Sequence, residues 1–169
     1  MYYGNIEEHD VINGPGVRTI LFVSGCTHKC RGCHNPDSWD FDYGEPFTKE
    51  VEDKIINYLK SPVVQGFSLL GGEPFDNVDD CVKLVKRIKQ ECPDKDIWVW
   101  SGYTFEYLNN HPSKRELLHL CDVLVDGRYN EGLRDLSLHY RGSSNQRIIN
   151  IQDSLVQKDK IVFNKFYYK

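Results

Sequence analysis

The sequence predicts an α/β fold of mainly parallel strands with helices outside them. Short, nearly continuous apolar runs alternate with segments of helical spacing along most of the chain. A glycine follows each apolar run within two residues, as is common where a strand turns into a loop. Strands that are apolar along their whole length are typical of a parallel sheet, and such a sheet is expected to be covered on both faces.

The first strand and helix are expected before residue 62. Val17 to Ser24 is rich in β-branched and aromatic residues, which favour a strand. Thr48 can cap a helix that runs to about Lys60, and Pro62 follows as a stop. The apolar residues of this segment keep helical spacing at Val51, Ile55, Ile56 and Leu59.

Three more strands are expected further along. Phe67 to Leu70 is the second, and the segment from Asn77 to Cys92 then has apolar residues at three- and four-residue steps, which predicts a helix. The third strand is Ile97 to Trp100, whose tryptophans are expected in the sheet core. Helices are expected on either side of Pro112, before the fourth strand, Val123 to Val125.

Four loops follow these strands directly: the loop after Ser24, Gly71 to Pro74, Ser101-Gly102 and Asp126 to Arg128. The carboxyl ends of parallel strands share one edge of the sheet, and the chemistry of such folds gathers there. We therefore expect the four loops to meet on one rim. Glycines after strands are also ordinary turn residues, so one loop alone does not establish a site.

Length and charge narrow the class of protein. The 169 residues are expected to form one domain with a core that needs no disulfides. A net charge of −4 without basic runs argues against nucleic acid as the main partner. No apolar run follows Met1 and none has the length of a membrane span, so we expect a cytoplasmic protein with no membrane partner.

Three clustered cysteines, Cys26, Cys30 and Cys33, form a CxxxCxxC motif. Closely spaced cysteines hold iron–sulfur cubes, and a cube with three protein thiolates has one iron free for a small molecule. The motif therefore predicts an open cluster site. Two other interpretations are a zinc site completed by His28 or His34 and a chance cluster of core cysteines. Within the loop, His28 could instead bond to a cluster sulfur or simply face water.

The other three cysteines differ from this cluster. Cys81 and Cys92 lie on the apolar face of the predicted helix, and Cys121 opens the last apolar run. We expect all three to be packed in the core rather than reactive.

Gly71-Gly72-Glu73-Pro74 is the second chemical motif. Paired glycines let the backbone approach a ligand closely, proline fixes the direction of exit, and glutamate adds an anionic acceptor. Such a loop could bind an ammonium group. Alone it would more often be a turn, but it follows the cysteine motif by one helix.

Together, the cysteine motif and this loop resemble the radical S-adenosylmethionine superfamily. Between about Ile12 and Arg147, the chain more narrowly resembles the activating enzymes of the anaerobic ribonucleoside-triphosphate reductase. The segments that carry this resemblance, in order, are Asn13 to Gly16, CTHKCRGC with His34-Asn35, IWVWSGY from Ile97, DVLVDGRY from Asp122 and RGSSNQR from Arg141. Residues 151–169 match no motif, and 161–163 with 166–168 are expected as a terminal strand or, second, as a partner-docking edge.

The resemblance implies a partial (β/α) barrel and a radical enzyme that acts on a protein. Cys26, Cys30 and Cys33 would hold a [4Fe-4S] cluster whose fourth iron binds S-adenosylmethionine. One electron, from a donor such as a flavodoxin, would cleave the sulfonium and release a 5′-deoxyadenosyl radical. That radical would abstract hydrogen from a glycine of the large reductase subunit and leave a glycyl radical there.

The resemblance also implies contacts to the methionine and ribose of S-adenosylmethionine. The backbone of Gly71 and Gly72, with Glu73, would hold the ammonium group. Arg128 would pair with the carboxylate, and Ser101 would meet the ribose hydroxyls.

Gly32 and His34, which flank Cys33, are expected to approach the adenine through backbone contacts. The wider superfamily usually has an aromatic residue just before the third cysteine, where this chain has Gly32. The turn from Asn13 to Gly16, with Arg18, is expected either to shape the entry for the partner's glycine loop or to be a plain turn.

Two other functions fit the same motifs. A related radical enzyme could act on a small molecule, although 169 residues leave little chain to close a dedicated pocket. A zinc-binding interaction module without catalysis is the other alternative. Iron together with acid-labile sulfide would exclude the zinc module.

Overall fold

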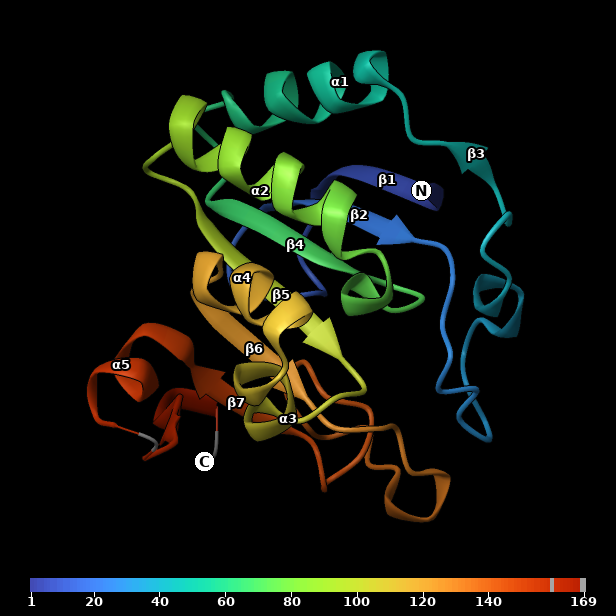
Figure 1. Ribbon diagram of the computed structural model, residues 1–169, viewed down its shortest axis with the longest axis vertical. Helices are drawn as coiled ribbons and strands as arrows, with labels where there is room; N and C mark the ends of the chain where they lie inside the picture. The colour runs from blue at the N-terminus through green and yellow to red at the C-terminus, as the bar shows by residue number, and fades with distance from the viewer. Residues whose placement is uncertain (159, 168–169) are drawn as a thin grey trace.

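We analysed a computed structural model that describes residues 1–158 and 160–167. The described chain forms an eight-stranded sheet with the order β3-β1-β2-β4-β5-β6-β7-β8 (Figure 1). The strands are β1 (Tyr2–Asp10), β2 (Arg18–Val23), β3 (Glu45–Pro46), β4 (Gly66–Gly71), β5 (Asp96–Ser101), β6 (Val123–Asp126), β7 (Arg147–Asn150) and β8 (Val162–Phe163). The helices are α1 (Lys49–Leu59), α2 (Val78–Glu91), α3 (Phe105–Asn110), α4 (Pro112–Leu120) and α5 (Ile151–Val156).

The middle of the sheet is parallel and its flanks are antiparallel. Strands β2, β4, β5 and β6 pair in parallel. The pairs of β1 with β2 and β3, and of β7 with β6 and β8, are antiparallel. The four predicted strands are these four parallel ones, so the predicted α/β class is confirmed for the centre of the sheet.

The predicted helices are also confirmed. Helix α1 begins after Thr48, whose side chain accepts a hydrogen bond from the Val51 amide. Helix α2 lies between Asn77 and Cys92, and α3 and α4 are separated by His111, directly before Pro112. Among the described residues, we find no helix with the length and apolar character needed to cross a membrane.

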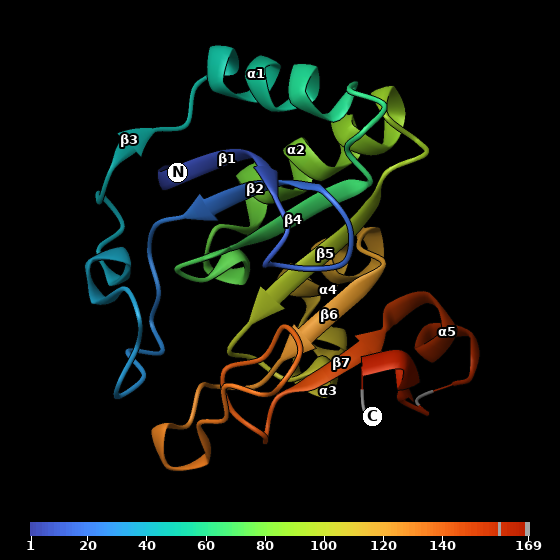
Figure 2. The same ribbon diagram turned by 180° about the vertical axis from the view of Figure 1, so that it is seen from behind.

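The expectation that helices cover both faces of the sheet is wrong. Helices α1 to α4 lie on one face (Figure 1), and none of them stands in front of the sheet when it is seen from behind (Figure 2). Alternation along the strands explains this arrangement, because Ile97 and Val99 of β5 belong to the core under the helices. The tryptophan between them, Trp98, belongs to a second apolar cluster, against which the half-buried Trp100 packs.

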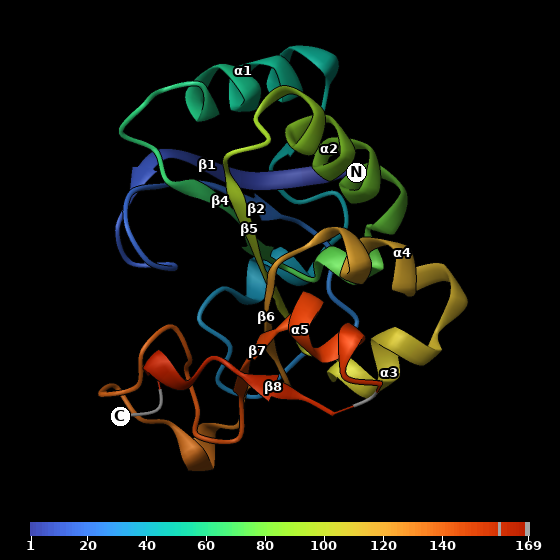
Figure 3. The ribbon, with the colours of Figure 1, turned by 90° about the vertical axis from the view of Figure 1, so that its left-hand side faces the viewer.

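The end of the described chain packs onto this second cluster. The ring of Tyr167 lies 5.6 Å from that of Trp98, in an edge-to-face arrangement. Strand β8 pairs with β7 beside it (Figure 3), so the expected terminal strand is confirmed for Val162–Phe163. The second expected strand segment is wrong for Phe166 and Tyr167, which lie in a 3-10 turn, and Tyr168 lies outside the described residues.

Arg18 is buried on the face of the sheet that the four helices leave open. Its side chain is 0 % exposed, and its Nη2 lies 2.8 Å from the Asp96 carboxylate. Its Nε donates to Ser68 Oγ at 2.7 Å and its Nη1 to the Pro15 carbonyl at 3.2 Å. Ser68 Oγ in turn donates to the Asn13 carbonyl. Arg18 therefore fastens the turn before β2 to the sheet, and Asn13 of this turn also lines the cavity at the strand ends.

Cys81, Cys92 and Cys121 are buried, as predicted. Cys81 and Cys121 belong to the large core under the helices and are fully enclosed, and burial raises the pKa of both thiols. Buried thiols of this kind behave as small apolar side chains.

Candidate metal and cofactor site

A cavity of about 720 Å³ lies at the carboxyl ends of the parallel strands. All four loops expected at this rim contribute to its wall. The lining residues from these loops are Cys26, His28, Cys30, Cys33, His34, Gly71, Gly72, Glu73, Ser101, Gly102 and Gly127. Of the predicted site residues, Gly32 and Arg128 do not line it.

Two residues in the left-handed region shape the cysteine loop. Lys29 has φ 47° and Gly32 has φ 74°. A side chain at position 32 would be strained by the positive φ, and its Cβ would also lie 3.0 Å from the Glu131 carboxyl group. This gives a physical reason why glycine, and not an aromatic residue, precedes the third cysteine.

The three clustered thiols are suited to a soft, cationic metal centre. Burial raises the pKa of Cys26 to about 11 and also raises that of Cys30. Thiolates are the metal-binding form, so a bound cationic centre would have to stabilise the charge that burial disfavours. No three His, Cys, Asp or Glu side chains of residues 1–158 and 160–167 are gathered around the position of a single ion. An iron–sulfur cube is wider, because each thiolate binds a different iron, and the three thiols around one cavity fit such a group.

Backbone contacts join the Gly-Gly-Glu-Pro loop to the start of the cysteine loop. The Gly72 amide donates to the Val23 carbonyl at 2.7 Å, and the Glu73 amide donates to the Gly25 carbonyl at 2.8 Å. A Cβ at Gly72 would lie 2.6 Å from the Gly25 oxygen. Glycine is therefore required here by the close approach of the two loops.

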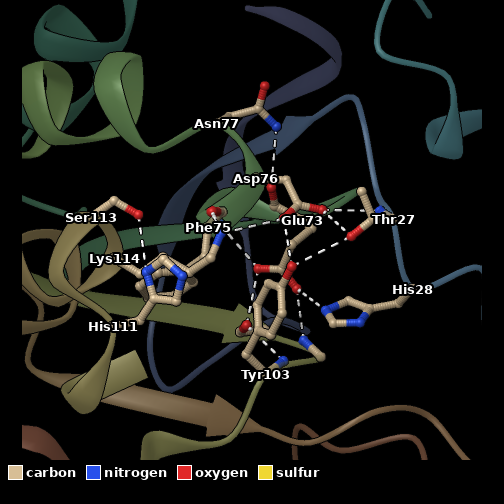
Figure 4. Close-up of polar contacts among 12 residues, drawn as sticks. Thr27, His28, Glu73, Phe75, Asp76, Asn77, Tyr103, His111, Ser113 and Lys114 are labelled. Atoms are coloured by element: carbon tan, nitrogen blue, oxygen red, sulfur yellow. Dashed lines mark hydrogen bonds and ion pairs between the residues drawn. The ribbon is translucent and has the colours of Figure 1, made fainter. Parts of the chain in front are cut away.

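The Glu73 carboxylate joins three of the rim loops (Figure 4). It is buried, and its Oε1 accepts from the Phe75 amide at 3.0 Å and from Ser101 Oγ at 2.9 Å. Its Oε2 accepts from the Gly102 amide at 2.8 Å and lies 2.9 Å from His28 Nε2. Four donors thus hold the carboxylate at the wall of the cavity.

One of the three interpretations of His28, that its side chain faces water, is wrong. Its side chain is 3 % exposed. Its Nδ1 accepts from Arg128 Nε at 3.1 Å, and its ring packs edge-on against Tyr103 with centroids 4.3 Å apart. Both ring nitrogens therefore have protein partners, which also leaves none for a zinc ion. The sequence could not reveal these contacts, because Glu73 and Arg128 lie 45 and 100 residues away.

Asp76, just after the Gly-Gly-Glu-Pro loop, holds the residue before His28 (Figure 4). Its Oδ2 accepts from the Thr27 amide at 2.9 Å and from the Thr27 hydroxyl at 2.8 Å. Its Oδ1 accepts from the Tyr103 hydroxyl at 2.8 Å and lies 3.5 Å from Lys114 Nζ. Burial alone would raise the pKa of Asp76, but these hydrogen bonds outweigh burial and lower it.

We expect Asp76→Asn to destabilise the protein at neutral pH, and the difference to shrink in acid. A carboxyl group with a lowered pKa stabilises the folded state above its unfolded pKa of about 4, and this contribution disappears as the pH falls through the folded value. Denaturant unfolding of both proteins at pH 7 and in steps below pH 5 measures the difference. A difference that stays constant with pH would show that the charge of Asp76 contributes nothing.

Arg128 follows β6 and is exposed. The chain also brings residues to the cavity that had no predicted role, among them Tyr129, Tyr140, Arg141 and Gln146. The last two belong to the RGSSNQR segment, so the resemblance marked this segment without giving it a function. Arg141 donates to the backbone carbonyls of Gln146 and Tyr167, which fixes the loop at the cavity wall.

Comparisons with known proteins agree with the motifs. The family described as "4Fe-4S single cluster domain" matches residues 12–149. A protein of Escherichia coli (strain K12) is 50% identical over 150 residues, which are 86% of this chain and 96% of that protein. One of Vibrio cholerae is 47% identical over 152 residues (88% and 97%), and one of Enterobacteria phage T4 is 38% identical over 161 residues (94% and 100%). All three are named "Anaerobic ribonucleoside-triphosphate reductase-activating protein".

Proposed function

The chain belongs to the family of anaerobic ribonucleoside-triphosphate reductase-activating proteins, and on that premise we propose that it activates such a reductase as a radical S-adenosylmethionine enzyme. The observation that carries the proposal is that the three clustered thiols and the buried Glu73 carboxylate line the same cavity. The macromolecular substrate is the large subunit of the reductase, and the reacting group is a glycine of that subunit.

Cys26, Cys30 and Cys33 hold the [4Fe-4S] cluster, and no fourth cysteine among the described residues lines the cavity. When bound, the cluster and S-adenosylmethionine would supply the radical chemistry that removes a hydrogen atom from the glycine. The protein binds these groups, orients them and limits the access of water. The sheet, with helices on one face and the cavity at its strand ends, would be the wall of a partial barrel.

In this proposal the Gly71-to-Glu73 loop holds the methionine ammonium group. In the described chain, the donors to the Glu73 carboxylate are two backbone amides, a hydroxyl and an imidazole, and no lysine or arginine pairs with it. A buried carboxylate without a cationic partner is costly. An ammonium group at the cavity wall would offset that cost.

Residues of the neighbouring loops are proposed to bind the rest of S-adenosylmethionine. Ser101 Oγ donates to Glu73 and accepts from the Tyr103 amide at 3.0 Å, which leaves one lone pair for a ribose hydroxyl. His34 follows Cys33 in the sequence and lines the cavity with its ring 5.8 Å from that of Tyr129, and the adenine is proposed to lie here. Gly32, which precedes Cys33, lies outside the lining and would act through the shape of the loop.

We propose that the protein works in the cytoplasm and receives its electron from a donor such as a flavodoxin. Its cysteines are free thiols, and the cluster ligands must remain reduced to bind iron.

Anaerobic purification followed by iron, zinc and acid-labile sulfide analysis tests the proposed function against the other two. Iron with sulfide, together with deoxyadenosine release on reduction, is the expected result. Zinc without sulfide would favour the interaction module. Turnover of a small molecule without any protein radical would favour the related enzyme with a small substrate.

A further inference from the structure

We infer that His28 is a positioning residue that joins the cysteine loop to Glu73, and that Arg128 acts through His28 rather than on S-adenosylmethionine. The inference rests on the proposed function, in which Glu73 lies at the ammonium subsite. It replaces the expected ion pair between Arg128 and the methionine carboxylate.

The partners of His28 fix the direction of its hydrogen bonds. Arginine Nε can only donate, so His28 Nδ1 accepts from Arg128 at 3.1 Å. The ring hydrogen is then on Nε2, which donates to Glu73 Oε2 at 2.9 Å. The order of donation is therefore from Arg128 to His28 and from His28 to Glu73.

The space around the ring allows little other placement. The His28 side chain is 3 % exposed, and Tyr103 packs against its ring. A Cβ on Gly102 would collide with the imidazole, so glycine at this position admits the ring. The Gly102 amide bonds to the same Glu73 oxygen as His28 does.

The bond between His28 and Glu73 connects two parts of the proposed site. His28 lies between Cys26 and Cys30, so its bond to Glu73 connects the loop that carries the thiols with the proposed ammonium subsite. Arg128, in contrast, is exposed and lies outside the lining of the cavity, although its neighbours Gly127 and Tyr129 belong to the lining. The side-chain hydrogen bond that Arg128 makes with the site is the one to the imidazole, although its charge also acts on the Cys30 thiol.

Two substitutions separate the two hydrogen bonds of His28. In His28→Gln the amide nitrogen can take the place of Nε2 and still donate to Glu73, but the acceptor for Arg128 is lost. In His28→Asn the amide oxygen can take the place of Nδ1 and accept from Arg128, but the donor to Glu73 is lost. His9→Gln, a change at an exposed histidine, is the matched control.

The affinity for S-adenosylmethionine is measured by titration of the reduced cluster's electron paramagnetic resonance spectrum, after iron analysis has shown that each variant is loaded. We expect His28→Asn to bind about ten- to a hundredfold more weakly, as for the loss of a hydrogen bond to a charged group. His28→Gln should lose no more affinity than Arg128→Ala does, because each removes only the hydrogen bond between these two residues. His9→Gln should bind as the wild type does. Wild-type affinity in His28→Asn, or an equal loss in His28→Gln, would overturn the positioning role.

A double-mutant cycle tests the part played by Arg128. If Arg128 acts through His28, Arg128→Ala has no additional effect on affinity in the His28→Gln background. Losses that add in the double variant would overturn this and restore a direct contact with the ligand. A loaded wild-type protein that does not bind S-adenosylmethionine would instead overturn the proposed function, and with it the inference.

Discussion

Cys26→Ser, Cys30→Ser and Cys33→Ser are each expected to abolish the [4Fe-4S] cluster and all cleavage of S-adenosylmethionine. The reason is that these three are the cysteines that line the cavity in the described chain, while the other cysteines are enclosed in the core. A serine hydroxyl is a far weaker ligand for iron than a thiolate is. Iron and sulfide content, with deoxyadenosine release under reducing conditions, measures the effect.

Cys81→Ala is the matched control, because it also removes a thiol but one that lies under the helices. It should keep its iron and its activity and lose about 1–2 kcal/mol of unfolding free energy, as small core truncations do. Loss of iron in a folded Cys81→Ala protein would contradict the assignment of ligands to the cavity.

Arg18→Ala is expected to have the largest effect on stability, about 2–4 kcal/mol of unfolding free energy, because it removes buried hydrogen bonds and leaves a cavity. The guanidinium bonds to Ser68 Oγ and to the Phe67 carbonyl, and it lies 5.7 Å from the centre of the Trp98 ring. Loss of the guanidinium leaves Ser68 Oγ and the Phe67 carbonyl buried without this donor. Chemical denaturation of the purified protein measures the change.

Arg87→Ala provides the comparison for Arg18. Arg87 also pairs with carboxylates, those of Glu52, Asp53 and Glu91, but at the surface of the helices. Surface ion pairs contribute little to stability, so this variant should unfold close to the wild type. Equal losses in the two variants would mean that burial of Arg18 is not what makes it important.

The central strands and the helices could be predicted because their pattern is local. Residues of the parallel strands are buried on both sides, and the cap of α1 is a single threonine. Strand β1 was missed because Tyr2–Asp10 has one aliphatic residue, Ile6, and is only partly buried. Its strand structure comes from pairing with β2 and β3 rather than from its own composition.

The one-sided helix layer was missed for a related reason. Side chains that are buried on the other face, such as Arg18 and Trp98, lie within the predicted strands. The strands therefore look buried on both faces, and this pattern predicts helices on both. That face is closed by the second apolar cluster, to which Tyr167 near the chain end belongs. Such a contact joins β5 to a segment about seventy positions later, which no local pattern reveals.

The candidate site also has parts that the sequence reveals and parts that it does not. The thiols and the Gly-Gly-Glu-Pro loop could be found because spacing and strand ends mark them. The partners of Glu73 could not, since its carboxylate receives donors from two loops that are distant in sequence, the cysteine loop and Ser101-Gly102. The hydrogen bond from Arg128 to His28 likewise depends on the folded arrangement.

Electron paramagnetic resonance of the reductase is the most direct measurement of what this protein does. Reduced, cluster-loaded protein and S-adenosylmethionine are mixed with the large subunit of the anaerobic reductase. A carbon-centred doublet should appear on that subunit and vanish when its radical-site glycine is changed to alanine. A loaded protein that cleaves S-adenosylmethionine but never produces this doublet would contradict activation of the reductase.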